Sequence, residues 1–450
     1  MEKFISKYGL AAHLAIVAVA PLFLSPTAVI YLSALALVWL IMEPSRIGYE
    51  SLHESRRRVF KAVMRDPVFW FSLVLLAMAV FRYYNTGIAR SYDAENAKWF
   101  LSTAAFPLMP GAVEGCGFAE MALCAVLVPL LPACQHALGR SARQMFAVFA
   151  SFFAGAGALT WATLIHLESP AALELLKQSA LNSDYYGTAF GVYFVLSTAA
   201  LFSVMERGWL RSLPLAMIGV GGTALALFLF APAYVQVLFV SAAFIVFLYS
   251  FVVARLSISG TAEFKYLVLF SLSLVGAYLV VFAVLGNDDI NARVLPYMTG
   301  EFLDERFFEV RELLDQISLR IWREHPWLGC GLGSYKTALA FHTTAEEWLT
   351  VSPMQVSPMN GYWLLLVERG AVGAFLFAVM LALLLWAYFA RLVKGVRAHL
   401  PSPLAFVGFF ALIAAALQGV VDISFLNPGL LAALTATVAL SASSFPKEKK

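Results

Sequence analysis

The chain has 450 residues, of which 61% are hydrophobic and only 13% are charged, and its formal net charge is +3. Soluble domains are usually about 45–50% apolar and about 25% charged, and even a large domain buries only about three quarters of the surface of its unfolded chain. The composition therefore excludes a soluble enzyme, a disordered scaffold and a nucleic-acid-binding module. Because the apolar residues form continuous runs rather than alternating with polar ones, the chain is predicted to be a helical membrane protein.

Twelve membrane-spanning helices are predicted, since a spanning helix needs about 20 mostly apolar residues. In chain order they cover residues 9–24, 26–42, 67–83, 116–134, 145–166, 185–205, 212–231, 233–254, 264–285, 360–390, 402–421 and 427–443. The predicted fold class is all-α, a polytopic transmembrane bundle. It divides the chain into spanning helices one to nine in residues 1–285, a loop domain in 286–358 and helices ten to twelve in 359–450.

The distribution of basic residues orients this bundle. Most of the 31 Lys and Arg residues fall on one side of the predicted spans, including six between Arg46 and Arg65. Basic loops face the cytoplasm, so both termini are predicted to be cytoplasmic and the loop 286–358 to lie on the opposite side.

The four cysteines, Cys116, Cys124, Cys134 and Cys330, are too few for a disulfide framework, and their spacing fits no metal site. Cys116 and Cys330 are predicted to lie on the same side of the membrane, so whether they form a disulfide stays open. No metal or other cofactor is predicted.

The loop 286–358 is the one large hydrophilic segment, with 11 acidic and six basic residues. Its apolar residues recur at helical spacing, at Leu303, Phe307, Val310, Leu314, Ile317 and Ile321. This spacing predicts an amphipathic helix that ends before Pro326. A loop of this length with its own helix is predicted to be folded and functional, whereas no inverted pair of broken helices, typical of transporters, is found.

Arg306 and Arg311 flank the apolar face of this predicted helix. A guanidinium suits phosphate or diphosphate because its planar fork gives bidentate, permanently charged hydrogen bonds. The alternative is that both arginines pair with acidic neighbours at helical spacing, such as Glu305, Glu309 or Asp315.

A glycine run follows the helix in the segment HPWLGCGLGSY, residues 325–335. Gly329, Gly331 and Gly333 allow backbone conformations closed to other residues and leave amides free to approach a ligand. His325 precedes a proline, where a histidine is either structural or part of the site.

This segment, with Arg311 fourteen residues before its histidine, resembles the O-antigen ligase and O-antigen polymerase superfamily. A second block is similar as well: Asn360 is followed by nine residues, then Gly370, two residues and Gly373. The motif similarity covers about residues 306–380, and the rest of the chain resembles the family only in its predicted topology.

The resemblance implies a metal-independent glycosyltransferase of a bacterial inner membrane. Members take a glycan from undecaprenyl diphosphate at the periplasmic face and transfer it to a sugar or lipid-sugar acceptor, in the biosynthesis of lipopolysaccharide or exopolysaccharide. It further implies that arginines hold the diphosphate and that a histidine activates the acceptor hydroxyl.

The chain departs from the family pattern at two places. Met359 occupies the histidine position of the second block, and the Ser-Arg-Gly segment near the outer end of the eighth helix is replaced by APAYVQ, residues 231–236. These departures leave open a second function, a lipid-linked glycan transporter or a catalytically silent subunit of a polysaccharide export machine.

Other residues are candidates for the missing roles. His342 is a candidate base, with an exposed loop histidine as the alternative. Arg369, beside Glu368 in the outer turn of the tenth helix, is either structural or a diphosphate ligand. The predicted catalytic residues are Arg311 and His342, and the predicted substrate-binding residues are Arg306, Arg369, His325, Gly329, Gly331, Gly333, Asn360 and Arg82.

Overall fold

The computed structural model describes most helices of the chain. The described residues are 2–43, 51–84, 88–93, 98–103, 140–166, 186–206, 210–231, 233–257, 305–331, 333–351, 358–397 and 403–420, with single positions in 122–138, 178–179 and 427–437. The predicted span 264–285 and the first part of the loop domain lie outside them.

Helices dominate the described residues, which confirms the helical class. The long helices are α1 (Glu2–Val19), α2 (Pro26–Met42), α3 (Leu52–Met64), α4 (Pro67–Tyr84), α6 (Arg140–His166), α8 (Tyr186–Glu206), α9 (Leu213–Phe230), α10 (Ala233–Ser257), α12 (Glu305–Glu324), α15 (Gly361–Arg397) and α16 (Pro403–Gln418). Shorter elements are η1 (Ala20–Leu22), η3 (Leu210–Ser212), α13 (Tyr335–His342) and α14 (Ala345–Val351).

Several of these helices are apolar enough to cross a membrane. Among the described residues, four are also long enough: Ala142–Leu164, Gly187–Met205, Leu213–Phe230 and Gly361–Ala390. Shorter apolar helices cover Gly9–Leu22, Pro26–Met42, Pro67–Met78, Val235–Leu248 and Val407–Gln418. The chain is therefore a membrane protein, while the total of twelve spans stays a prediction.

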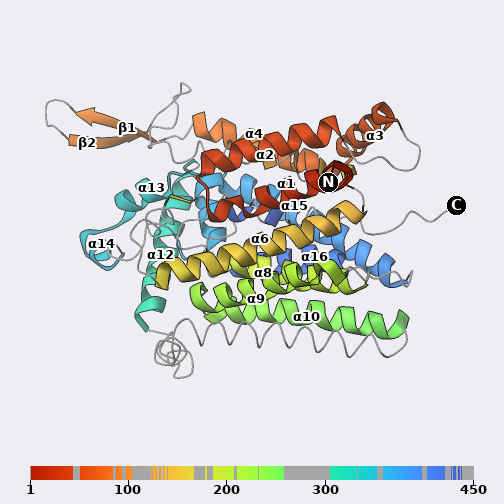
Figure 1. Ribbon diagram of the computed structural model, residues 1–450. Helices are drawn as coiled ribbons and strands as arrows, with labels where there is room; N and C mark the ends of the chain where they lie inside the picture. Colours follow the sequence, from red (N-terminus) through yellow and green to blue (C-terminus); the bar gives the residue numbers. More distant parts are fainter. Residues whose placement is uncertain are drawn as a thin grey trace.

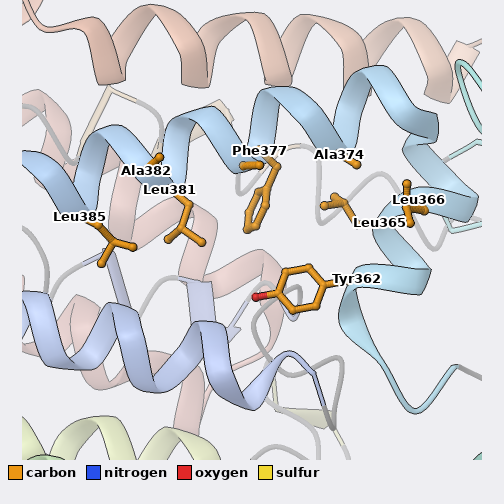
Figure 2. A pocket seen from close by; sticks show the side chains of 9 residues that line it. Tyr362, Leu365, Leu366, Ala374, Phe377, Leu381, Ala382 and Leu385 are labelled. Atoms are coloured by element: carbon orange, nitrogen blue, oxygen red, sulfur yellow. The ribbon is translucent and has the colours of Figure 1, made fainter.

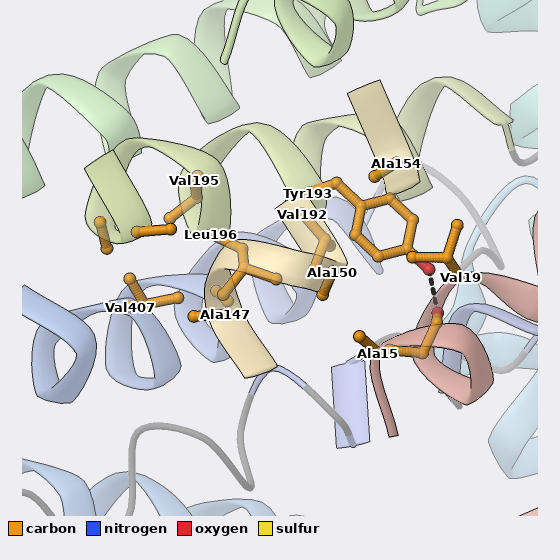
Figure 3. Packing of buried hydrophobic residues seen from close by; sticks show 14 of the residues in the cluster. Ala15, Val19, Ala147, Ala150, Ala154, Val192, Tyr193, Val195, Leu196 and Val407 are labelled. Atoms are coloured by element: carbon orange, nitrogen blue, oxygen red, sulfur yellow. Dashed lines mark hydrogen bonds between the residues drawn. The ribbon is translucent and has the colours of Figure 1, made fainter. Parts of the chain in front are cut away.

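The core of the bundle surrounds α8, which is buried along almost its whole length. Figure 3 shows Val192, Tyr193 and Leu196 of α8 packed among small side chains such as Ala150 of α6 and Ala15 of α1. The hydroxyl of Tyr193 donates a hydrogen bond to the carbonyl of Ala18.

Glycines bring α6 and α9 into direct backbone contact. A Cβ on Gly222 would lie 2.2 Å from the carbonyl oxygen of Gly155, and one on Gly155 would lie 2.4 Å from that of Ile218. Close approach through small residues is a common way to pack helices where the apolar solvent supplies no hydrophobic driving force.

The two ends of the bundle carry different elements (Figure 1). The segments α12, α13 and α14 lie at one end, together with a hairpin of β1 (Ile88–Asp93) and β2 (Lys98–Thr103), whereas α3 lies at the other end near the start of α1. The strands pair antiparallel, with Ile88 opposite Thr103, and this hairpin was not expected in an all-α chain. The described helices of the loop domain and the basic helix α3 are thus at opposite ends of the bundle.

Candidate functional site

The candidate site is built on α12, whose buried face matches the predicted one. Val310, Leu314, Ile317 and Ile321 are each at most 1% exposed. They pack against α13 and the first part of α15, and Cys330 contributes to the same cluster. Cys330 is a buried free thiol, and Cys116 lies outside the described residues.

The glycine run continues directly from α12 and meets α15 at a break in that helix. Gly370 has φ 66° and ψ −177°, so the helical path stops there and resumes at the next residue. Gly329, Gly331 and Gly333 also have positive φ, at 70°, 112° and 71°. These conformations are strained for any residue with a Cβ.

Main-chain hydrogen bonds join the glycine run to both sides of the break. They run in both directions: Cys330 N to Val367 O (2.8 Å), Gly331 N to Glu368 O (3.1 Å), Ala371 N to Pro326 O (2.8 Å) and Val372 N to Trp327 O (3.2 Å). The break leaves carbonyls without helical donors on one side and amides without helical acceptors on the other. The loop satisfies both sets, which is why the interruption is tolerated.

The two glycines at the contact have no space for a side chain. A Cβ on Gly370 would lie 2.3 Å from the carbonyl oxygen of Trp327, and a Cβ on Gly329 would lie 2.4 Å from the carbonyl carbon of Glu368. Gly329 and Gly370, from the two separate sequence blocks, are therefore direct neighbours. We name this contact the loop–helix joint (residues 326–331 with 367–372).

Arg311 lies on α12 and reaches the end of α16. Its Nη2 donates to the carbonyl of Val420 at 2.8 Å. The same end of α16 accepts from Gly361 N at Gly419 O (2.9 Å) and from the Tyr362 hydroxyl at Ala416 O (2.7 Å). Arg311 thus helps to fix the loop domain to α16 with one of the five N–H donors that a guanidinium carries.

Asp315 lies one helical turn after Arg311 and is a further candidate site residue. From the sequence it was predicted only as an ion-pair partner of the arginines. Its Oδ1 is buried and has no hydrogen-bond partner among the described residues. Burial raises the pKa of the Asp315 carboxyl, and the nearby Arg311 guanidinium partly opposes this shift. The helical spacing of four from Arg311 was the signal that could have identified it.

Asp315→Asn is expected to raise the thermal unfolding midpoint at neutral pH. Below its ordinary pKa of about 4, the carboxyl is protonated in the folded and the unfolded state and does not oppose folding. As the pH rises through the raised folded-state pKa, ionisation of the carboxyl destabilises the folded state. The variant and the wild type should therefore converge near pH 4. Unfolding of the detergent-solubilised proteins between pH 4 and pH 8 measures this, and a wild type that is the more stable at neutral pH would contradict it.

Glu368 and Tyr335 form a buried polar contact beneath α12. Glu368 is only 8% exposed, and its Oε1 accepts from the Tyr335 amide at 3.2 Å. The Tyr335 hydroxyl lies 2.9 Å from the Ser318 hydroxyl, and burial raises the pKa of this tyrosine. Arg369, half-buried, follows Glu368 directly at the break.

His342 does not have the geometry of a free base. It ends α13, where Nδ1 lies 2.8 Å from the carbonyl of Ala338 and Nε2 lies 3.0 Å from the carboxylate of Glu324. Both ring nitrogens therefore lie within hydrogen-bond distance of an oxygen atom of the protein. The exposed-histidine alternative does not hold either, because the side chain is 18% exposed.

The second sequence block has structural roles at its start. Asn360 precedes α15, and its Oδ1 accepts from the amide of Tyr362 at 2.9 Å, as at a helix N-terminus. Met359 packs against the apolar cluster under α12. Both residues therefore stabilise the entry into α15.

Three further predicted residues are placed by their main chain. Arg306 lies in the first turn of α12 and Arg82 near the end of α4, both with side chains outside the described part. The carbonyl of His325 accepts from Gly329 N at 2.9 Å, which closes the turn after α12. Helix α4, which carries Arg82, ends at Tyr84 at the same end of the bundle as α12 (Figure 1).

An apolar groove of about 300 Å³ follows the break along α15. Figure 2 shows Tyr362 and Leu365 on the short first segment of the helix, and Phe377, Leu381 and Leu385 on the long second segment, lining one space. Its one polar group in view, the Tyr362 hydroxyl, is bonded to Ala416. The groove therefore suits a hydrocarbon chain and no charged ligand.

No protein-family model matches this chain, and no curated protein is significantly similar to it.

Proposed function

We propose that this protein is a glycosyltransferase of the O-antigen ligase and polymerase type in a bacterial inner membrane. It would transfer an undecaprenyl-diphosphate-linked glycan to a sugar hydroxyl at the periplasmic face. The observation that carries the proposal is the loop–helix joint, in which Gly329 and Gly370 of the two motif blocks are in contact. Blocks that are about 40 residues apart in sequence thus form one structural unit, which includes Arg369, whereas Arg311 contacts Val420 near the end of α16.

Two chemical tasks follow from such a reaction. The departing diphosphate needs positive charge, which Arg311 and Arg369 supply in this proposal. The acceptor hydroxyl needs a proton acceptor. Since Met359 has no basic group and both nitrogens of His342 are engaged, we assign this task to Asp315, whose buried Oδ1 has no hydrogen-bond partner among the described residues and whose pKa is raised by burial.

The apolar groove on α15 supports a lipid-linked donor. It starts at the break in the helix and runs along the segment that is apolar enough to span a membrane. A polyprenyl chain in this groove would place its diphosphate near residue 370, which follows Arg369 directly in the chain.

Reconstitution tests the proposal. The purified protein in liposomes, supplied with undecaprenyl-diphosphate oligosaccharide and a sugar acceptor, is expected to release free undecaprenyl diphosphate and to lengthen the acceptor. Mass spectrometry of the lipid fraction measures the release, and liposomes without the protein are the control. Asp315→Asn is expected to lose this release while remaining folded.

The second candidate is a lipid-linked glycan transporter or a silent subunit of an export machine. The apolar packing of Met359 and the engaged ring of His342 favour it. The same liposomes separate the two functions, because a transporter changes the leaflet of the intact donor without releasing undecaprenyl diphosphate.

A further inference from the structure

Helix α3 lies at the end of the bundle opposite the candidate site (Figure 1). It begins with a capping box, in which the Ser51 hydroxyl accepts from the Glu54 amide and the Glu54 carboxylate accepts from the Ser51 amide. From Ser51 to Asp66 the chain has five basic and two acidic residues. This is a short helix of high positive charge between two apolar helices.

Hydrogen bonds fix the rotation of α3 about its axis. Arg56 donates to the carbonyl of Met42 through Nε (2.9 Å) and Nη2 (2.6 Å), which holds the last residue of α2. Arg58 donates to the carbonyl of His136 at 3.2 Å. These two arginines therefore turn toward the protein.

The opposite face of α3 points outward. Arg57 and Lys61 are exposed on it, one helical turn apart, and Phe60 between them is 65% exposed. An exposed aromatic ring between two cations is typical of a helix that lies in a membrane interface.

The neighbouring helices place this face at the level of lipid headgroups. The exposed apolar side chains of α2 include Leu35, Val38 and Ile41, and they stop at Met42, where Arg56 binds. Exposed apolar faces of membrane helices contact lipid tails, so the headgroups begin where such a face ends. Trp70 of α4, half-exposed, donates to the carbonyl of Met64 at 2.9 Å, and tryptophan is enriched at this same level.

We propose that α3 binds anionic phospholipid headgroups through Arg57 and Lys61, with Phe60 inserted between the acyl chains. The occupant is the lipid surface because the cations and the aromatic ring share one exposed face, and this face continues the lipid-exposed surface of α2. None of these three residues belongs to the candidate site, so the inference is independent of the proposed function.

The test is native mass spectrometry of the full-length protein in mixed micelles of phosphatidylglycerol and phosphatidylcholine at equal concentration. The wild type is expected to retain phosphatidylglycerol preferentially. The double variant Arg57→Gln and Lys61→Gln should bind it about 30-fold more weakly, since each cation near a charged membrane surface contributes about 1 kcal/mol. Phe60→Ser should reduce retention of both lipids.

The matched control is Arg211→Gln with Arg323→Gln, which removes two exposed charges away from α3. It should retain the preference of the wild type. If the double variant does not fold, the single variant Arg57→Gln replaces it in the test. It is expected to bind phosphatidylglycerol about five-fold more weakly than the wild type. The proposal is overturned if the wild type retains the two lipids equally. It is also overturned if the double variant keeps the preference for phosphatidylglycerol, which is the result expected if the partner of α3 is an acidic protein.

Discussion

Replacing Arg311 by alanine is expected to abolish glycan transfer while leaving the amount of protein in the membrane unchanged. The guanidinium would stabilise negative charge that develops on the departing diphosphate, and loss of one such donor usually lowers the rate by about 100-fold to 1,000-fold. The structural cost is smaller. The variant loses one hydrogen bond, to the Val420 carbonyl at 2.8 Å, which is worth about 1 kcal/mol.

Product length and amount in cells, with membrane expression measured in parallel, check this expectation. The matched control is Arg320→Ala on the same helix, whose Nη2 is paired with Glu347 at 2.8 Å. It should transfer glycan at nearly the rate of the wild type. Unchanged product in Arg311→Ala would exclude the assignment, and an equal loss in both variants would indicate a general defect of α12.

The second large effect is expected from Gly370→Ala. The new methyl group would lie 2.3 Å from the Trp327 carbonyl oxygen and 2.5 Å from the Gly329 amide nitrogen, both backbone atoms that cannot rotate away. The conformation itself costs a residue with a Cβ about 1–3 kcal/mol. The loop–helix joint should open, and the segment 305–351 should become sensitive to protease at a temperature at which the wild type resists.

Gly373→Ala is the control for this variant, three residues further along α15. There the new Cβ meets the Arg369 side chain, with Cβ at 2.5 Å, and the backbone is not in the left-handed region. A smaller loss of protease resistance is expected. If Gly373→Ala proves equally damaging, close packing along α15 rather than the break at Gly370 controls the stability of the loop.

The sequence predicted the parts of this molecule that depend on local spacing. The apolar face of α12, from Val310 to Ile321, is confirmed because helical periodicity alone determines which residues share a face. The helices α12 to α14 of the loop domain and the basic helix α3 lie at opposite ends of the bundle (Figure 1), while the side of the membrane that each faces stays a prediction. The twelve spans and the function remain predictions.

The break in α15 could not be predicted in the same way. Residues 361–390 are apolar enough to form one spanning helix, and Gly370 alone does not reveal whether that helix continues. What stabilises the break is the hydrogen bonding of Pro326 and Trp327 to Ala371 and Val372, about 45 positions along the chain. The pairing of His342 with Glu324 is similarly non-local, so the sequence could not show that this histidine is engaged.

The loop–helix joint is made by hydrogen bonds of the main chain, so it depends little on the identity of the exposed side chains in it. Trp327 and Leu328 are 71% and 42% exposed although their backbone lies at the joint, so their side chains can be exchanged freely. The glycines of the joint and its buried residues Cys330, Val367 and Glu368 are constrained. A methionine at position 359 is compatible with this main-chain contact, because Met359 packs against the apolar cluster under α12. Distant kin of this chain are best sought by the spacing of their glycines rather than by overall similarity.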